Sequence, residues 1–257
     1  MLSVTILTKN SEKYIKQCLS ALQKFSEVIV LDNDSTDNTL EIAQKFSNVK
    51  IFQNKFIGFG PLKNLAAEKT VHDWILNIDS DEIMTGPLLD EIFKLKPEER
   101  IVYRLGRYNY YNKKWIKACG WHPDRVIRLY NKKMTSYNDY LVHESIGIKT
   151  GMEIKDLCHP LEHHPFQSVE EMTHKMHHYT NLFAQQYKNK KNVPLWLASI
   201  KTIYTFIKNY FFQKGFLYGY EGLAISFYNA SGVFFKYLKL YELNRSNNSS
   251  PSRESSN

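Results

Sequence analysis

The sequence has few cysteines and no long apolar run. Its three cysteines, Cys18, Cys119 and Cys158, lie far apart and form no CxxC pair. This spacing argues against a disulfide framework and a cysteine-based zinc site, and it fits a reducing compartment. The longest uncharged run in the C-terminal part, 222–235, contains Asn229 and is shorter than the roughly 20 residues of a transmembrane helix. No charged and apolar leader opens the chain, so we expect a cytoplasmic protein.

Positive charge is concentrated in one part of the chain. Residues 1–100 carry a net charge of −3, whereas residues 101–257 carry +11. A basic half suits a polyanionic partner such as a phosphorylated lipid, an anionic membrane surface or a nucleic acid. The sequence has none of the RRM, KH, zinc-finger or helix-turn-helix patterns, so we expect no nucleic-acid partner. A basic nucleic-acid-binding module remains an alternative function, as does a non-catalytic scaffold.

The first part of the chain alternates between apolar runs and helical patterns. Short connections between the two favour an α/β fold with a mostly parallel sheet and helices on both faces. The expected strands are 2–8, 27–32, 49–53 and 74–78, and the expected helices follow Ser11 and span 39–46 and 62–70.

The rest of the chain changes character twice. Residues 101–165 alternate apolar and polar positions, which indicates antiparallel strands. Helical patterns begin at Ser168 and Pro194, and Gly215 separates the second helix from a last one. We therefore expect an α/β domain over 1–165, made of a first half over 1–100 and of further strands over 101–165. A helical region over 166–245 and a disordered tail over 246–257 would follow it.

Polar clusters follow three of the expected strands, at 8–10, 32–37 and 79–82. In open α/β sheets, ligands bind at this edge. Asp79 and Asp81 flank Ser80, and two carboxylates at this spacing can hold a hard cation that bridges phosphate oxygens. A nucleotidyltransferase also uses paired carboxylates, but the segment TKNSEKY after the first strand lacks the glycines that such an enzyme needs.

The cluster 32–37 has two interpretations. Side chains of Asp32 and Asn33 can pair with a base edge or a ribose hydroxyl. The same segment can form an Asx-turn and a helix N-cap, in which Ser35 or Asp37 would be structural. The two interpretations are compatible with each other.

Several segments together resemble glycosyltransferase family 2, whose members have the GT-A fold. These segments are LSVTILTKN, EVIVLDNDSTDNT and LKNLAAEKTVHDWILNIDSDE. The later segments CGWHPDRVIRLYNKK, YLVHESI and KGFLYGYEGL resemble the bacterial subgroup that adds glucose or related sugars to the lipopolysaccharide inner core (WaaE/KdtX-like and LgtF-like). The resemblance covers most of residues 1–243. It departs at Asn33, where many members have a second consecutive aspartate.

The resemblance implies an inverting hexosyltransferase that uses a nucleotide-sugar donor, most simply UDP-linked. Residues 1–165 would then be the catalytic domain, with the nucleotide-sugar-binding half over 1–100 and the acceptor-side strands over 101–165. The acceptor would be a lipid-linked or core oligosaccharide. Asp79 and Asp81 would hold Mg²⁺ or Mn²⁺, with a late histidine, His143 or His164, completing the shell. The expected donor-binding residues are Thr8, Asn10, Asp32, Asn33, Lys63, Asp79 and Ser80.

Inversion requires a carboxylate that deprotonates the acceptor hydroxyl. Two candidates fit the sequence. Asp124 lies in a turn before a strand, and Glu144 follows an apolar step in the segment VHE. Asp124 could instead pair with Arg125 or Arg128, and the sequence does not choose between the two carboxylates.

The expected C-terminal helices are rich in aromatic and basic residues, among them Trp196, Tyr204, Lys201 and Lys208. Amphipathic helices of this composition suit a lipid interface. We therefore expect peripheral contact with the inner face of the bacterial cytoplasmic membrane. In the alternative, the aromatic residues pack on the catalytic domain and the lysines face water.

Overall fold

The computed structural model describes residues 1–248, so most of the predicted tail, 246–257, lies outside the described residues. The last helix, α7 (Gly219–Asn248), includes the first three tail positions. The chain forms two compact units, one of residues 1–115 and 122–165, the other of 116–121 and the residues from 166 on. The predicted boundary at 165 had assigned the short segment 116–121 to the first part.

Four parallel strands form one half of the sheet in the first unit, in the order β3-β2-β1-β4. All five residues of β2 are buried, as expected for a strand with helices on both of its faces. The strands are β1 (Leu2–Thr8), β2 (Val28–Asp32), β3 (Val49–Gln53) and β4 (Trp74–Asp79), and the helices between them are α1 (Glu12–Ala21), α2 (Thr39–Ala43) and α3 (Phe59–Glu68). The predicted alternation of strands and helices is therefore confirmed.

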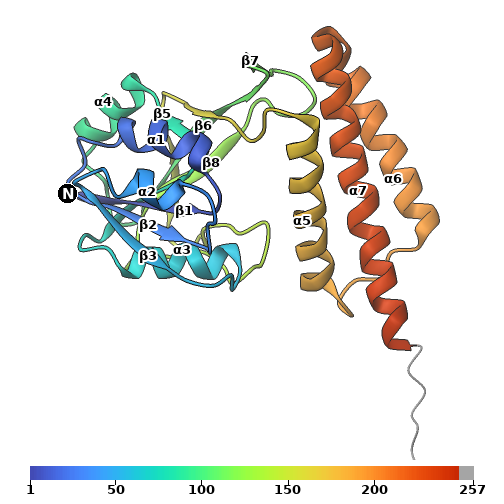
Figure 1. The fold of residues 1–257 in the computed structure, drawn as a ribbon, viewed down its shortest axis with the longest axis horizontal. Coiled ribbons are helices and arrows are strands. Elements are labelled where there is room, and N and C mark those ends of the chain that lie inside the picture. The colour runs from blue at the N-terminus through green and yellow to red at the C-terminus, as the bar shows by residue number, and fades with distance from the viewer. Residues whose placement is uncertain (249–257) are drawn as a thin grey trace, which may run out of the picture. The chain divides into compact units, whose positions relative to one another are not determined.

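Helices cover both faces of this parallel half (Figure 1). On one face, Val4 and Val30 pack in the same core cluster as Ile15 of α1. The helix α4 (Gly86–Lys94) contributes to the same cluster. On the opposite face, Leu31 packs against Leu62 of α3. Alternate residues of each strand therefore serve two separate cores.

The other half of the sheet is mixed. Its strands are β5 (Glu82–Met84), β6 (Ile101–Tyr111), β7 (Lys114–Trp115), β8 (Arg125–Asn131), β9 (Glu153–Asp156) and β10 (Leu161–His163). β8 lies antiparallel between β4 and β6, as expected. The antiparallel prediction was wrong for β9, which pairs with β6 in parallel, and it was correct only in part for β10, which pairs with β5 in antiparallel but with β6 in parallel. A local alternating pattern predicts a strand, but the direction of pairing depends on distant residues.

The second unit is helical. Its elements are α5 (Val169–Tyr187), α6 (Leu195–Ile207), η1 (Lys208–Phe212), η2 (Gly215–Tyr218) and α7. α7 contacts both α5 and α6. The turn before α7 approaches it closely, because a Cβ on Gly222 would lie 1.8 Å from the carbonyl oxygen of Gly215. Within residues 1–248, none of the helices combines the length and apolar character that crossing a membrane requires.

Candidate active site

The parallel strands place three predicted site residues at one edge of the sheet. Thr8 of β1 is in register with Asp32 of β2, and Leu7 is in register with Asp79 of β4. Because parallel strands end on the same side, the polar clusters that follow them meet there. The sequence predicted this edge correctly.

The loops after β1 and β2 are tied to each other. The backbone N–H of Asn10 donates to the Ser35 hydroxyl at 2.8 Å, and the Asn10 side-chain oxygen accepts from the Thr36 N–H at 2.8 Å. The Asp32 carboxylate accepts from both the backbone N–H and the hydroxyl of Ser35, at 3.0 and 2.5 Å. Asn10 and Asp32 therefore hold the two loops in place, in agreement with the structural interpretation of the cluster 32–37.

Two buried polar atoms at the same edge have no hydrogen-bond partner within the described part of the chain. They are the hydroxyl of Thr8 and the side-chain oxygen of Asn33, and these two residues are 2% and 7% exposed. Leaving such an atom unsatisfied costs about 1–3 kcal/mol. A ligand that donates hydrogen bonds at this edge would recover that cost.

Asp79 is held by two cations. Its carboxylate lies 3.1 Å from the ammonium of Lys63 and also pairs with the guanidinium of Arg128. Arg128 is buried and pairs with Glu82 as well. Burial acts to raise the pKa of the Asp79 carboxyl, but Arg128 and Lys63 outweigh it and hold that pKa well below its usual range. Asp79 is therefore ionised at neutral pH.

Lys63 connects Asp79 to Glu144. Its ammonium lies 2.8 Å from a carboxylate oxygen of Glu144, in addition to its contact with Asp79. Burial acts to lower the pKa of this lysine, yet Asp79, Tyr137 and Glu144 raise it above the ordinary value. A charged, buried lysine thus brings Glu144, a residue of the loop after β8, next to the acidic cluster.

Asp124 contacts other side chains than Asp79 and Glu144 do. One of its carboxylate oxygens accepts from Arg107 at 2.8 Å and from the amide of Asn109 at 2.9 Å. Burial acts to raise the pKa of Asp124, but Arg107 and the hydrogen bonds from Asn109 and Arg107 lower it. The suggested pairing with Arg125 or Arg128 is wrong. Arg125 pairs with Asp156, and Arg128 with Asp79 and Glu82.

The imidazole of His163 lies close to Asp81. Its Nε2 lies 3.6 Å from a carboxylate oxygen of Asp81. The neighbouring His164, which was one of the two expected residues, instead donates its backbone N–H to the Asp81 carbonyl at 2.9 Å. The other expected residue, His143, has an exposed side chain. The sequence missed His163 because a pair of adjacent histidines does not reveal which ring faces the site.

The hydrogen-bond network fixes the tautomer of His163. The Asn109 amide nitrogen donates to Asp124, so its oxygen faces Nδ1 of His163, at 2.6 Å. Because that oxygen can only accept, Nδ1 carries the proton. In a neutral imidazole, the lone pair is then on Nε2, on the side of Asp81, and metal ions bind to such a nitrogen.

The charges at this site favour a divalent cation. Five carboxylates and three cationic side chains give the site a net charge of −2. The carboxylates are those of Asp79, Asp81, Glu82, Asp124 and Glu144, and the cations are Lys63, Arg107 and Arg128. Carboxylate oxygens are suitable ligands for Mg²⁺ or Mn²⁺. Over residues 1–248, no three acidic, histidine or cysteine side chains are grouped closely enough to hold a metal by themselves. The residues therefore fit a cation that takes its remaining ligands from water or phosphate.

Ser80 links the acidic motif to the start of α1. Its hydroxyl lies 2.8 Å from the hydroxyl of Ser11. Ser11 stands at the predicted N-cap position of α1, but its side chain makes no capping hydrogen bond. The hydroxyl of Ser11 is used to fix the loop between β4 and β5 instead.

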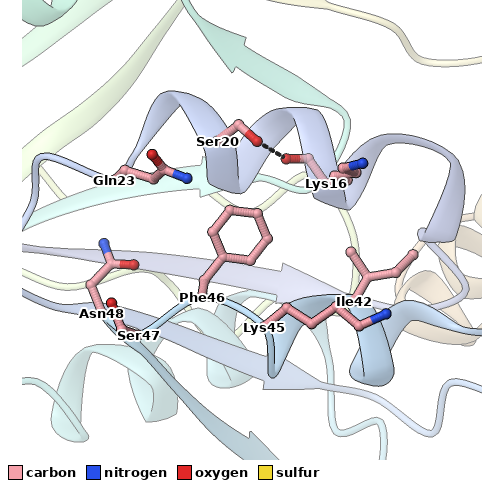
Figure 2. Close-up of a pocket in the computed structure, with 8 residues that line it drawn as sticks. All are labelled: Lys16, Ser20, Gln23, Ile42, Lys45, Phe46, Ser47 and Asn48. Carbon is pink, nitrogen blue, oxygen red and sulfur yellow. Dashed lines mark hydrogen bonds between the residues drawn. The ribbon is translucent and has the colours of Figure 1, made fainter.

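A surface cavity elsewhere on this unit lacks catalytic groups. It measures about 680 Å³ and lies between α1 and the segment that contains α2, with the Phe46 ring between the two (Figure 2). Its lining includes Lys16 and Lys45 but no carboxylate. The strand edge, where the ionised groups converge, is therefore the better candidate for a catalytic site.

Comparison with known proteins identifies the family of the chain. The model of the family described as Glycosyl transferase family 2 matches residues 3–156. An uncharacterized glycosyltransferase of Rickettsia typhi is 29% identical over 255 residues, with 94% of this chain and 87% of the relative covered. The lipopolysaccharide core biosynthesis glycosyltransferase LpsC of Rhizobium meliloti is 24% identical over 254 residues, covering 94% and 92%. The crystal structure of S. aureus TarS 1–349 with UDP-GlcNAc is 17% identical, covering 96% and 92%, with a TM-score of 0.49.

Proposed function

The chain belongs to glycosyltransferase family 2, and we propose that it moves a hexose from a nucleotide-sugar to a surface glycan acceptor with inversion at the anomeric carbon. Glucose is the first candidate for the hexose. The observation that carries this proposal is the contact of one buried ammonium, that of Lys63, with both Asp79 and Glu144. It puts a candidate base beside the candidate diphosphate site, as a single displacement requires.

The donor would lie across the ends of β1, β2 and β4. Thr8 and Asn33 offer unsatisfied buried oxygens, which suit the N–H and O–H groups of a base and a ribose. A uracil nucleotide provides such groups, and we propose UDP as the carrier. The aspartate to asparagine change at position 33 leaves an acceptor oxygen and adds a donor.

The acidic residues would bind the diphosphate through a cation. We propose that Asp79, Asp81 and Nε2 of His163 become ligands of Mn²⁺ or Mg²⁺ together with the phosphate oxygens of the donor, because these three side chains are not grouped closely enough to hold the ion by themselves. When bound, such an ion neutralises the charge that develops on the leaving nucleoside diphosphate. Arg128 keeps Asp79 ionised, and the hydrogen bond from Nδ1 of His163 to Asn109 puts the lone pair of the neutral ring on Nε2. His143 remains a less favoured ligand, since its side chain is exposed.

We propose Glu144, and not Asp124, as the base. The low pKa of Asp124 and its contacts with Arg107 and Asn109 make it a weak proton acceptor. Glu144 would take the proton of the acceptor hydroxyl as the hydroxyl oxygen bonds to the anomeric carbon. The bond from that carbon to the diphosphate oxygen breaks, and its electron pair leaves with the nucleoside diphosphate. Lys63 orients Glu144 during this step.

The acceptor we propose is a lipopolysaccharide or lipooligosaccharide core, or a similar lipid-linked glycan. The support is the similarity to LpsC over nearly the whole of both chains. An acceptor of this kind is anchored in a membrane, so the enzyme would work at the inner face of the bacterial cytoplasmic membrane.

Turnover of defined donors tests the proposal. The purified chain is incubated with UDP-hexoses, core oligosaccharide and Mn²⁺ or Mg²⁺, and the release of UDP and the anomeric configuration of the product are measured. We expect metal-dependent release and a β-linked product from an α-linked donor. Release without metal, or a product that retains the donor configuration, would contradict the proposed mechanism.

A further inference from the structure

The second unit carries a concentrated apolar surface. Of the 21 large apolar side chains that are exposed among the described residues, 13 lie between Leu195 and Phe227. Trp196 and Leu217 are each 65% exposed, and Phe212 is 78% exposed. An apolar patch of this extent on a folded protein marks an interaction surface.

These side chains follow one face of α6 and continue past its end. Trp196, Ile200, Ile203 and Ile207 recur at three- and four-residue spacing and are all exposed, which places them on one side of the helix. The exposed Phe211 of η1 continues this spacing. The other side of α6 contacts α7, and Ala198 there is fully buried. Phe212 follows in η1, and Phe216 and Leu217 in η2. We call this set of residues the α6 face.

The hydroxyl groups of α6 are satisfied within the helix. Ser199, Thr202 and Thr205 donate to the carbonyl oxygens four residues earlier, at 3.1, 2.8 and 2.7 Å. They therefore need no hydrogen bonds from water. A helix with this property can exchange water for an apolar environment at low cost.

Positive charge accompanies the α6 face. The residues of the second unit, 116–121 and 166–257, hold a net charge of +7 of the chain's +8. Lys208 and Lys214 are exposed and lie in η1 and immediately before η2, next to apolar positions of the face. Long lysine side chains can keep their stems in an apolar layer and their ammonium groups in a polar one.

We propose that the α6 face inserts into the surface of an anionic lipid bilayer. Exposed aromatic and aliphatic residues beside lysines match the boundary between acyl chains and negatively charged headgroups. A second copy of the chain is a poorer partner, because a symmetric dimer would bring two units of charge +7 together. This inference concerns attachment alone and does not depend on the proposed reaction.

Flotation with lipid vesicles tests the inference. The full chain is mixed with vesicles of phosphatidylcholine alone or with phosphatidylglycerol added, at low and high salt. We expect binding to the anionic vesicles that weakens as salt rises. Absence of binding to anionic vesicles would overturn the inference.

Matched variants locate the contact. Ile200→Glu with Ile203→Glu should weaken vesicle binding about tenfold or more. Val71→Glu with Ile148→Glu, at exposed apolar positions of the first unit, should not weaken it. Equal losses in the two pairs would show that the α6 face is not the contact.

The charges are tested in the same way. Lys208→Gln with Lys214→Gln should weaken binding to anionic vesicles, whereas Lys24→Gln with Lys96→Gln in the first unit should not. Binding of UDP by all the variants should equal that of the wild type, which separates a failure of attachment from a failure of the proposed reaction.

A third measurement does not require a disruptive substitution. Vesicles with bromine-labelled acyl chains should quench the fluorescence of the wild type, and Trp196→Phe should lose most of the quenching while it keeps vesicle binding. Unchanged quenching in Trp196→Phe would overturn the inference. Sedimentation without lipid gives a second way to overturn it. If the wild type is a dimer that Ile200→Glu with Ile203→Glu dissociates, a second copy of the chain covers the α6 face.

Discussion

Arg128 connects the two carboxylates of Asp79 and Glu82 in the interior of the α/β unit. Its removal leaves the buried charge of Glu82 and the partly buried charge of Asp79 without their principal partner. We therefore expect Arg128→Gln to lower the free energy of unfolding of this unit by about 3–5 kcal/mol. Urea denaturation at neutral pH, followed by the near-ultraviolet signal, measures this change.

Arg104→Gln is the matched control. Arg104 also binds a carboxylate with two hydrogen bonds, to Asp156, but both side chains are on the surface, where solvent screens the pair. We expect no marked change in this variant. A loss in Arg104→Gln as large as in Arg128→Gln would contradict the importance assigned to the buried network.

Glu144 and Asp124 make different contacts and should respond differently to neutralisation. We expect Glu144→Gln to lower kcat by about 10²–10⁴-fold, the range for loss of general base catalysis, with UDP affinity kept. Asp124→Asn should keep more of kcat, because the residue acts through Arg107 and Asn109. Steady-state kinetics combined with UDP binding distinguishes the two residues, and the opposite order of effects would assign the base to Asp124.

The sequence identified the acidic motif at the residue scale but not its partners. Asp79 and Asp81 follow a buried strand, a local signal. The arginines that neutralise this region, Arg107 and Arg128, come from β6 and β8, and His163 comes from β10. No local pattern distinguishes these three side chains from other polar residues on alternating strands, because only the sheet order brings them to β4.

Two serines before helices illustrate the same limit at the scale of an element. Ser168 caps α5, since its hydroxyl accepts from the Glu171 N–H at 3.1 Å. Ser11 precedes α1 without a side-chain cap. We expect Ser168→Ala to reduce the protection of the first turn of α5 by about 1 kcal/mol in hydrogen exchange.

Ser11→Ala should leave the first turn of α1 unchanged. Its expected effect is a weaker donor affinity, because the contact with Ser80 that fixes the acidic loop is lost. A loss of protection in α1 as large as that in α5 would mean that Ser11 acts as a cap.

The strands and helices of the parallel half were predictable because each carries its own periodicity. The directions of β9 and β10 were not, because both depend on pairing with β6. The surface of α6 was predictable in part. Its spacing predicted an amphipathic helix, but the exposed fractions show that the apolar side faces outward.

Acid should destabilise the α/β unit as a whole. Burial opposes ionisation of Asp79 and Asp124, yet the neighbouring cations lower the pKa of both below the ordinary value of about 4. A lowered pKa in the folded state adds stability that is complete above the unfolded pKa and is lost as the pH falls through the folded pKa. We expect the free energy of unfolding to decrease from about pH 5 downward.

Asp79→Asn removes one of these carboxylates. The decrease in the free energy of unfolding between neutral pH and about pH 3 should then be smaller than in the wild type. Urea denaturation at a series of pH values measures both slopes. Equal slopes would show that Asp79 is not held ionised by its partners.

At the scale of the whole molecule, the two units divide the proposed work between them. In these proposals, the carboxylates of the first unit bind donor and cation, and the apolar, basic second unit attaches to lipid. The division explains why the basic charge stands almost entirely in one unit although the reaction concerns a diphosphate. Binding of UDP should therefore be unaffected by changes in the α6 face.

The most direct test of the central claim is calorimetric binding of UDP with and without Mn²⁺ to the wild type, to Asp81→Ala and to Asp156→Ala, a surface control. We expect Mn²⁺ to strengthen UDP binding in the wild type and the control. Asp81→Ala should lose that gain, by about 100-fold or more when a metal ligand is removed. Full metal-dependent UDP affinity in Asp81→Ala would contradict the assignment of Asp79-Ser80-Asp81 as the metal and diphosphate site.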